Sequence, residues 1–352
     1  MSRFLCERYT ELVPYTPGEQ PRDRKYIKLN TNESPYPPSP KAQLAAAQAA
    51  AELQLYPDPT CDALTREIAA LCGVTPDQVL VTNGSDEILN FAFMAFCDTN
   101  HPAAFPNITY GFYSVFAALN GVEYREIPLD TEFKVRPADY AGLSHTIFIA
   151  NPNAPTGLAL TPAQVEEILQ QNPDRVVVID EAYVDFGAES CVPLIQRYDN
   201  LLVTQTFSKS RSMAGARLGF GVGNRELIAD LNRIKYATNP YNINRMTMAA
   251  GLGVLADEAY TRCHCLEVAQ TRQQTAAALQ EMGFTLTDSV TNFLFARHPD
   301  YDGESLYRHL KSDGILVRHF NKPGIDEYVR ITIGTPEEMQ ALLQSLRRLL
   351  EG

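Results

Sequence analysis

The sequence predicts an α/β protein, a three-layer sandwich in which helices cover both faces of a mostly parallel sheet, with a smaller α+β domain attached. From residue 78 to residue 222, short apolar runs alternate with helix-like stretches, an order typical of such a sheet. Runs such as residues 176–179 lack polar alternation, which favours strands buried on both faces. The 352 residues, 45% of them hydrophobic, suffice for one large and one small domain.

The elements of the large domain follow in order along the chain. Residues 35–40 are rich in proline and predict an extended arm, and the alanine-rich residues 41–55 predict a helix. Thr161 is the predicted N-cap of a helix that runs to residue 169. The other predicted elements are a helix at 86–96 and strands at 79–81, 122–127, 146–150, 176–179, 201–204 and 220–222.

The pattern changes after about residue 265, which indicates the smaller domain. A long helix is predicted to lead into strands at 293–296, 315–318 and 328–333, with helices at 304–311 and 336–350. We therefore expect an N-terminal arm (1–45) that packs as part of the small domain, a large domain (46–264) and a small C-terminal α+β domain (265–352).

Composition argues against several classes of function. The net charge is −12, with 42 acidic and 30 basic residues, and nucleic acids and anionic membranes both require basic surfaces. No basic start precedes an apolar segment at the N-terminus, and no apolar stretch reaches the length of a membrane span. The sequence favours a cytoplasmic protein with reduced thiols. Cys263 and Cys265 flank His264, but this spacing is more typical of a helix surface than of a metal site.

A lysine segment follows the predicted strand at 201–204. It reads Thr206-Phe207-Ser208-Lys209, and Arg217 comes eight residues after the lysine. A neutral lysine at the mouth of a sheet can form an imine with a carbonyl cofactor. The hydroxyls of Thr206 and Ser208, with the Arg217 guanidinium, would suit a phosphate dianion. Taken alone, the segment fits a surface lysine in a serine-rich loop better than a cofactor site.

Asp180 and Tyr183 end another predicted strand, residues 176–179. Ligands of open α/β sheets bind beyond the carboxyl ends of the strands. A carboxylate beside an apolar run is costly without a partner. A protonated pyridine nitrogen would be such a partner, and the ion pair would keep the ring an electron sink. A helix cap or a structural ion pair explains Asp180 equally well.

Two further segments with possible binding groups also follow predicted strands. Gly84, Ser85 and Asp86 lie between a strand and a helix, where free backbone N–H groups bind phosphate and glycine permits close approach. A cap supplied by Ser85 is the alternative, and it does not exclude phosphate binding. Residues 151–157 contain two prolines and a glycine, which fix a turn. A side-chain amide in that turn could donate to a phenolate oxygen, although the segment alone would pass as a loop.

Four strand-end elements, each suited to one part of a single cofactor, favour one shared site. On these residues the chain resembles fold-type-I pyridoxal-phosphate aminotransferases, and within them the histidinol-phosphate aminotransferase family. The resemblance runs nearly end to end. It rests on VPY (13–15), LNTNESP (29–35), YPD (56–58), GSDE (84–87), TYG (109–111), DEAY (180–183), SK (208–209) and VRITIG (329–334).

The resemblance implies roles for the cofactor-binding residues. Lys209 would hold pyridoxal 5′-phosphate as an imine and, once displaced, carry a proton between the substrate Cα and the cofactor. Asp180 would pair with the pyridinium nitrogen, Tyr183 would donate to the ring oxygen and lower the pKa of the imine, and Tyr110 would stack on the ring. The implied phosphate ligands are Gly84, Ser85, Asp86, Thr206, Ser208, Arg217 and, in a homodimer with shared active sites, the partner subunit's Tyr56.

The resemblance also implies a substrate pocket. Arg330 would bind the substrate anion, Arg318 is a second candidate for phosphate with a solvated strand residue as its alternative, and Tyr15 and Asn30 would help to close the pocket. One departure stands out. The family usually has an asparagine directly before Pro-Thr-Gly, and this chain has Ala154 there. We expect that Asn153 substitutes for it or that Tyr183 acts alone on the ring oxygen.

The predicted reaction is a ping-pong transamination between small molecules, an amino donor and a 2-oxo acid acceptor. Histidinol phosphate and 2-oxoglutarate would be the pair, as in histidine biosynthesis. Relatives of similar sequence act on aromatic amino acids or decarboxylate threonine phosphate, and the tyrosines do not decide among these. The non-enzymatic alternative is a cofactor-binding regulatory protein, although the presence of Lys209, Asp180 and Arg217 favours an enzyme. A nicotinamide enzyme is disfavoured because the glycine fingerprint is absent.

Overall fold

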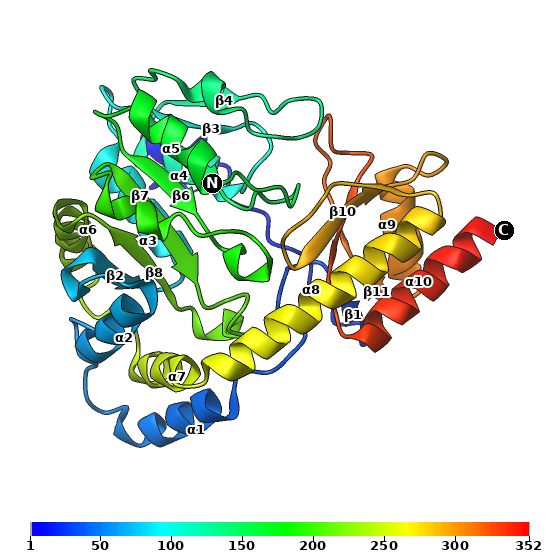
Figure 1. The fold of residues 1–352 in the computed structure, drawn as a ribbon, viewed down its shortest axis with the longest axis horizontal. Coiled ribbons are helices and arrows are strands. Elements are labelled where there is room, and N and C mark those ends of the chain that lie inside the picture. The colour runs from blue at the N-terminus through cyan, green and yellow to red at the C-terminus, as the bar shows by residue number, and fades with distance from the viewer. Residues whose placement is uncertain (1, 352) are drawn as a thin grey trace.

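A seven-stranded sheet forms the centre of the larger part of the molecule (Figure 1). The computed structural model describes residues 2–351. The strand order is β2-β8-β7-β6-β5-β3-β4, and only β8 runs antiparallel to its neighbours. This confirms the mostly parallel sheet. The strands are β2 (Val79–Thr82), β3 (Ala103–Pro106), β4 (Tyr124–Ile127), β5 (Thr146–Ala150), β6 (Val177–Asp180), β7 (Leu201–Thr206) and β8 (Gly219–Gly223).

Helices cover both faces of this sheet, because alternate side chains of each strand point to opposite faces. Ile147 and Ile149 of β5 belong to a core with α2, α5 and α7, whereas Phe148 belongs to a second core with α3, α4 and α6. The prediction of a three-layer α/β sandwich is confirmed. The helices are α2 (Asp62–Cys72), α3 (Ser85–Phe96), α4 (Phe112–Asn120), α5 (Pro162–Gln171), α6 (Arg225–Thr238) and α7 (Arg245–Leu255).

The smaller part contains a four-stranded antiparallel sheet in the order β12-β13-β10-β9. The N-terminal strand β1 pairs in parallel with β11, so the arm lies against the C-terminal region. These strands are β1 (Ile27–Lys28), β9 (Thr285–Leu286), β10 (Phe293–Arg297), β11 (Ile315–Leu316), β12 (Arg318–His319) and β13 (Val329–Thr332), and the helices beside them are α9 (Gly303–Ser312) and α10 (Pro336–Glu351).

The predicted domain boundaries, after residues 45 and 264, both fall inside helices. Helix α1 (Pro40–Ala49) packs on α7 of the large part, and α8 (Glu258–Glu281) runs from beside α7 to beside α10 (Figure 1). A change of residue pattern does not mark a boundary within a continuous helix. Helix α8 therefore connects the two parts as one continuous helix.

Several local expectations are corrected. The strand predicted at 315–318 is divided at Val317, because β11 pairs with β1 whereas β12 pairs with β13. Cys265 is not on a helix surface but in the core of the smaller part, whereas Cys263 is exposed. Thr161 is confirmed as an N-cap, with Gln164 in a capping box. Among residues 2–351, no helix is long and apolar enough to span a membrane.

Candidate active site

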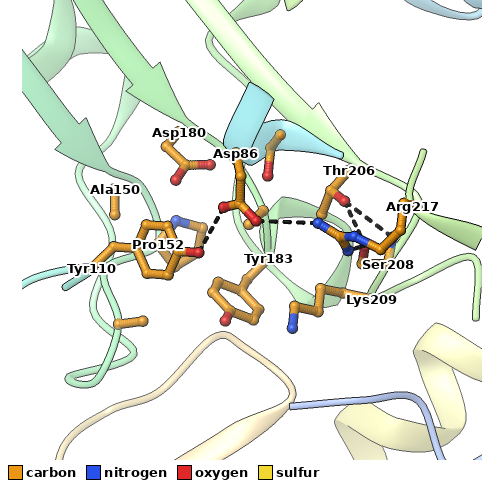
Figure 2. Close-up of a pocket in the computed structure, with 13 residues that line it drawn as sticks. Asp86, Tyr110, Ala150, Pro152, Asp180, Tyr183, Thr206, Ser208, Lys209 and Arg217 are labelled. Atoms are coloured by element: carbon orange, nitrogen blue, oxygen red, sulfur yellow. Dashed lines mark hydrogen bonds and ion pairs between the residues drawn. The ribbon is translucent and has the colours of Figure 1, made fainter. Parts of the chain in front are cut away.

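The candidate site lies where the carboxyl ends of β5, β6 and β7 meet one edge of the large sheet. Two adjoining cavities open there, and Tyr110, Ala154, Tyr183 and Lys209 line both. The inner cavity is surrounded by the segments that the sequence singled out (Figure 2). The outer cavity lies between the large sheet, the N-terminal arm and the strands that carry Arg318 and Arg330. Lys209 is therefore accessible from both cavities.

Lys209 follows β7, and its side chain reaches into the inner cavity (Figure 2). Its Nζ donates to the backbone carbonyl of Thr31 at 3.3 Å. The same atom lies 5.7 Å from the centre of the Tyr183 ring. The sequence alone could not separate this position from a surface loop; the structure places the amine between the large domain and the arm.

Asp180 ends β6 with only 4% of its surface exposed. Its carboxylate accepts hydrogen bonds from two neutral hydroxyls, those of Tyr113 and Thr204, each at 3.2 Å. Burial raises the pKa of Asp180 to about 6 despite these bonds. A protonated pyridine nitrogen would stabilise the ionised form, so the site fits that ring. Sequence reasoning missed Tyr113 and Thr204, since both lie in apolar segments.

The start of α3 forms one side of an anion-binding cradle. Its N-cap is Gly84 and not Ser85, and no side chain caps the helix. Gly84 has φ +75°, and a Cβ there would lie 2.5 Å from Nη2 of Arg217. Arg217 Nη1 lies 3.3 Å from Ser208 Oγ, to which Thr206 Oγ1 also donates. A helix N-terminus, two hydroxyls and a guanidinium together fit a phosphate group.

Asp86 lies inside this cradle, although its carboxylate would repel a phosphate. The carboxylate accepts a hydrogen bond from the Tyr110 hydroxyl at 2.6 Å and pairs with Arg217 Nη2 at 3.1 Å (Figure 2). The side chain thus fixes the Tyr110 ring and the Arg217 guanidinium. As an expected phosphate ligand, Asp86 could contribute only its backbone N–H, which lies in the first turn of α3. Tyr110, held in this way, forms part of the wall of both cavities.

Asn153 does not line either of these cavities. Its Nδ2 donates to the Ile108 carbonyl at 2.9 Å and to Thr156 Oγ1 at 3.1 Å, and its Oδ1 accepts from Thr109 at 2.8 Å. The side chain is buried, and these bonds use both amide hydrogens. This corrects the expectation that Asn153 substitutes for the missing asparagine, because it keeps no donor for a ring oxygen. Ala154 lines the cavity instead.

The outer cavity is strongly cationic. Lys209, Arg318, Lys322 and Arg330 line it, and none of the described residues in its wall is acidic. Arg330 Nη2 donates to the Asn30 carbonyl at 3.0 Å, whereas its buried Nε has no partner among the described residues. Burial lowers the pKa of Arg330. Sequence reasoning missed Lys322, which lies in a loop without a recognisable motif and donates to the Asn107 carbonyl.

The N-terminal arm supplies the facing wall of the outer cavity. Tyr15 stacks on Phe112 with ring centres 4.3 Å apart, and burial raises the pKa of its hydroxyl. Arg318 donates to two arm carbonyls, those of Thr16 and Pro17, at 3.2 and 3.3 Å. Asn30 also lines this cavity. Since Arg330 also donates to the arm, at the Asn30 carbonyl, backbone carbonyls of the arm hold both arginines.

Tyr56 lies apart from both cavities of its own chain. The side chain is 79% exposed and stacks on Tyr241, with 4.7 Å between the ring centres. Within one chain, the structure does not bring Tyr56 to the phosphate cradle.

Comparison with known proteins gives consistent matches along the whole chain. The family model of class I and II aminotransferases matches residues 24–346. Histidinol-phosphate aminotransferases from Marinomonas sp. and Brachyspira hyodysenteriae are 50% and 49% identical, covering 99% and 100% of this chain and all of each relative. The crystal structure of a putative histidinol-phosphate aminotransferase from Erwinia carotovora atroseptica is similar, with a TM-score of 0.85 and 28% identity over 93% of this chain and 96% of that one.

Proposed function

Because the chain belongs to the class I and II aminotransferase family, we propose that it transfers an amino group between histidinol phosphate and 2-oxoglutarate. Pyridoxal 5′-phosphate is the cofactor that the inner cavity fits, since Lys209, Asp180 and the cradle around Arg217 each match one part of it. The reaction is a ping-pong transamination that serves histidine biosynthesis.

The cationic lining of the outer cavity is the observation that supports the choice of substrate. This enzyme must accept two unlike ligands in turn, glutamate with its carboxylates and a phosphate ester without a carboxylate. Arg318 and Arg330 line the same cavity, and a guanidinium can bind either anion in bidentate geometry. The nearby Lys322 adds a further positive charge. An aromatic amino acid would need fewer of these charges.

The chain's own groups divide the chemistry among them. Bound pyridoxal phosphate supplies a ring that accepts the electron pair left when the substrate Cα–H bond breaks. Lys209 would hold the cofactor at rest, and its amine, once freed, would take the substrate Cα proton and return it on the cofactor side. Asp180 would keep the ring nitrogen protonated through an ion pair. The wall formed by Tyr15 and the arm would shield a substrate bound in the outer cavity from part of the solvent.

A screen of half-reactions tests the assignment. The purified protein, loaded with pyridoxal phosphate, is mixed separately with histidinol phosphate, glutamate, phenylalanine and threonine phosphate. We expect histidinol phosphate and glutamate to convert the cofactor to its amine form, seen as loss of visible absorbance. Faster conversion by phenylalanine would replace this function with an aromatic aminotransferase, and carbon dioxide release from threonine phosphate with a decarboxylase. Absorbance unchanged by every donor would indicate a regulatory protein.

A homodimer with shared active sites is also part of the proposal. The exposed stack of Tyr56 and Tyr241 supports it, because such aromatic surfaces are typical of interfaces. Mixing Lys209→Ala chains with Tyr56→Ala chains should form hybrid dimers in which one site has both defects and the other has neither. Activity at limiting cofactor should then exceed the mean of the two parents, whereas unshared sites would give that mean. The seven free thiols support a cytoplasmic location, which cell fractionation would test.

A further inference from the structure

Three consecutive residues of the N-terminal arm, Asn30, Thr31 and Asn32, each contact a different functional side chain. The Asn30 carbonyl accepts from Arg330 at 3.0 Å, and the Thr31 carbonyl accepts from Lys209 at 3.3 Å. The Asn32 amide Nδ2 donates to the Tyr183 hydroxyl at 2.9 Å. We call these three residues the strap. Only the third contact involves a side chain of the strap, so it depends on the residue type.

Asn32 is held rigidly by the smaller part of the molecule. Its backbone has φ +56°, a left-handed conformation that asparagine tolerates better than most residues. Its backbone N–H donates to Thr332 Oγ1 at 3.0 Å, and its carbonyl accepts from Asn292 Nδ2 at the same distance. Only 1% of its surface is exposed. The amide of Asn32 therefore has one accessible orientation.

The hydrogen-bond pattern also fixes which amide atom faces Tyr183. Thr332 Oγ1 accepts from the Asn32 N–H, so its own hydrogen is available for Asn32 Oδ1, which lies 3.0 Å away. The amide nitrogen must then point to the Tyr183 oxygen. A phenol oxygen that accepts such a bond keeps its own hydrogen for another acceptor, and donation becomes stronger. Tyr183 lines both cavities, so that acceptor can be a bound ligand.

We propose that Asn32 is a positioning residue that sets Tyr183 as a hydrogen-bond donor to the ring oxygen of the cofactor, an inference that rests on the proposed function. The loop beyond β5 provides no second donor there, because Ala154 presents a methyl group and Asn153 has used its amide hydrogens. The Asn32–Tyr183 pair thus acts without help from that loop. Through Thr332 and Asn292, the packing of the smaller part controls the donor.

The test is a pH titration of the visible absorbance of the protein loaded with pyridoxal phosphate. Donation to the ring oxygen favours the deprotonated imine, so loss of donation should move the titration midpoint to higher pH. Asn32→Gly keeps the left-handed backbone and removes the amide, and Asn32→Asp replaces the donor with an acceptor. We expect upward shifts of about half a unit to one unit, the worth of one hydrogen bond. Ser34→Ala, a substitution in the same arm that removes the hydrogen bond donated by Ser212 of the large domain, is the matched control and should not shift the midpoint.

The Tyr183→Phe background separates positioning from other effects. If Asn32 acts through the tyrosine hydroxyl, Asn32→Asp and Asn32→Gly should add no shift to that of Tyr183→Phe. An added shift there would show that the new charge or a general loosening is responsible, which would overturn the inference. Asn32 variants that titrate like the wild-type protein would also overturn it. A wild-type protein without a titrating visible band would instead refute the proposed function, and the inference with it.

Discussion

Arg318 and Arg330 lie directly opposite each other in the antiparallel ladder of β12 and β13. Both guanidinium groups lie 5.6 Å from the centre of the Phe320 ring. Like charges in directly opposed positions destabilise a sheet. The pKa of Arg330 is lowered mainly by burial, and the positive charge of Arg318 also lowers it. A bound anion would relieve this repulsion, so we expect the pair to contribute to binding and not to stability.

Removal of either arginine should therefore affect binding more than folding. Arg330→Ala should lower kcat/KM for glutamate and histidinol phosphate by roughly 10- to 100-fold, the worth of a charged hydrogen-bonded contact. Arg318→Gln should weaken histidinol phosphate more than glutamate and leave the unfolding temperature unchanged or raised. The two half-reactions, measured separately by stopped flow, check both variants. Selective loss of one ligand in Arg330→Ala would mean that the two anions use different arginines.

Replacement of Lys209 should stop proton transfer but leave much of the cofactor site intact. Lys209→Ala should lower the transamination rate by at least about 100-fold, because a positioned acid–base group is lost. The phosphate cradle of the cofactor site, centred on Arg217 and Ser208, would remain in this variant. Lys209→Arg is the control that keeps a positive charge without a usable base. Transamination by Lys209→Ala at the wild-type rate would exclude this lysine as the proton carrier.

The stability of the cofactor-free protein should reveal the cost of burying Asp180. The pKa of this carboxyl is raised from its ordinary value of 3.8 to about 6 in the folded protein. Ionisation thus opposes folding fully above pH 6, and the penalty fades as pH falls toward 4. Asp180→Asn should stabilise the cofactor-free protein by roughly 1–3 kcal/mol at pH 7.5 and by less at pH 5.

Denaturant unfolding at the two pH values measures this difference, and cofactor titration supplies the second half of the test. The same Asp180→Asn variant should bind pyridoxal phosphate more weakly, because the ring nitrogen loses its ionic partner. A gain in stability that is equal at both pH values would contradict the role of the buried charge.

Two glycines with similar backbone conformations separate the phosphate cradle from simple strain. Gly84 has φ +75° and Gly73 has φ +67°, but only at Gly84 would a Cβ meet another group, Arg217 Nη2. Each substitution by alanine should cost about 1–2 kcal/mol of stability through the backbone. Gly84→Ala alone should reduce affinity for pyridoxal phosphate, by at least about tenfold. Equal affinities in the two variants would show that the cradle tolerates a displaced Arg217.

The sequence by itself determined most of the central sheet and the order of its loops, but it did not predict β3 (Ala103–Pro106), which lies between β5 and β4. Strands such as β5 and β6 coincide with local apolar runs, which can be recognised in the sequence without knowing the partner strands. The same runs placed Asp180 and Lys209 at one edge, because parallel strands end together. The boundaries predicted after residues 45 and 264 fall inside α1 and α8, because the residue pattern did not reveal that one continuous helix runs through each position.

Only the tertiary structure decided which side chains meet across that edge. The Asn153 side chain points inward to Ile108 and Thr109, although its position in the loop had predicted a donor for the cofactor. The tertiary structure also joined Asn32 to Tyr183, which lie 151 positions apart in the sequence. Hydrogen bonds are short and directional, so their partners depend on packing at ångström scale that residue patterns do not encode.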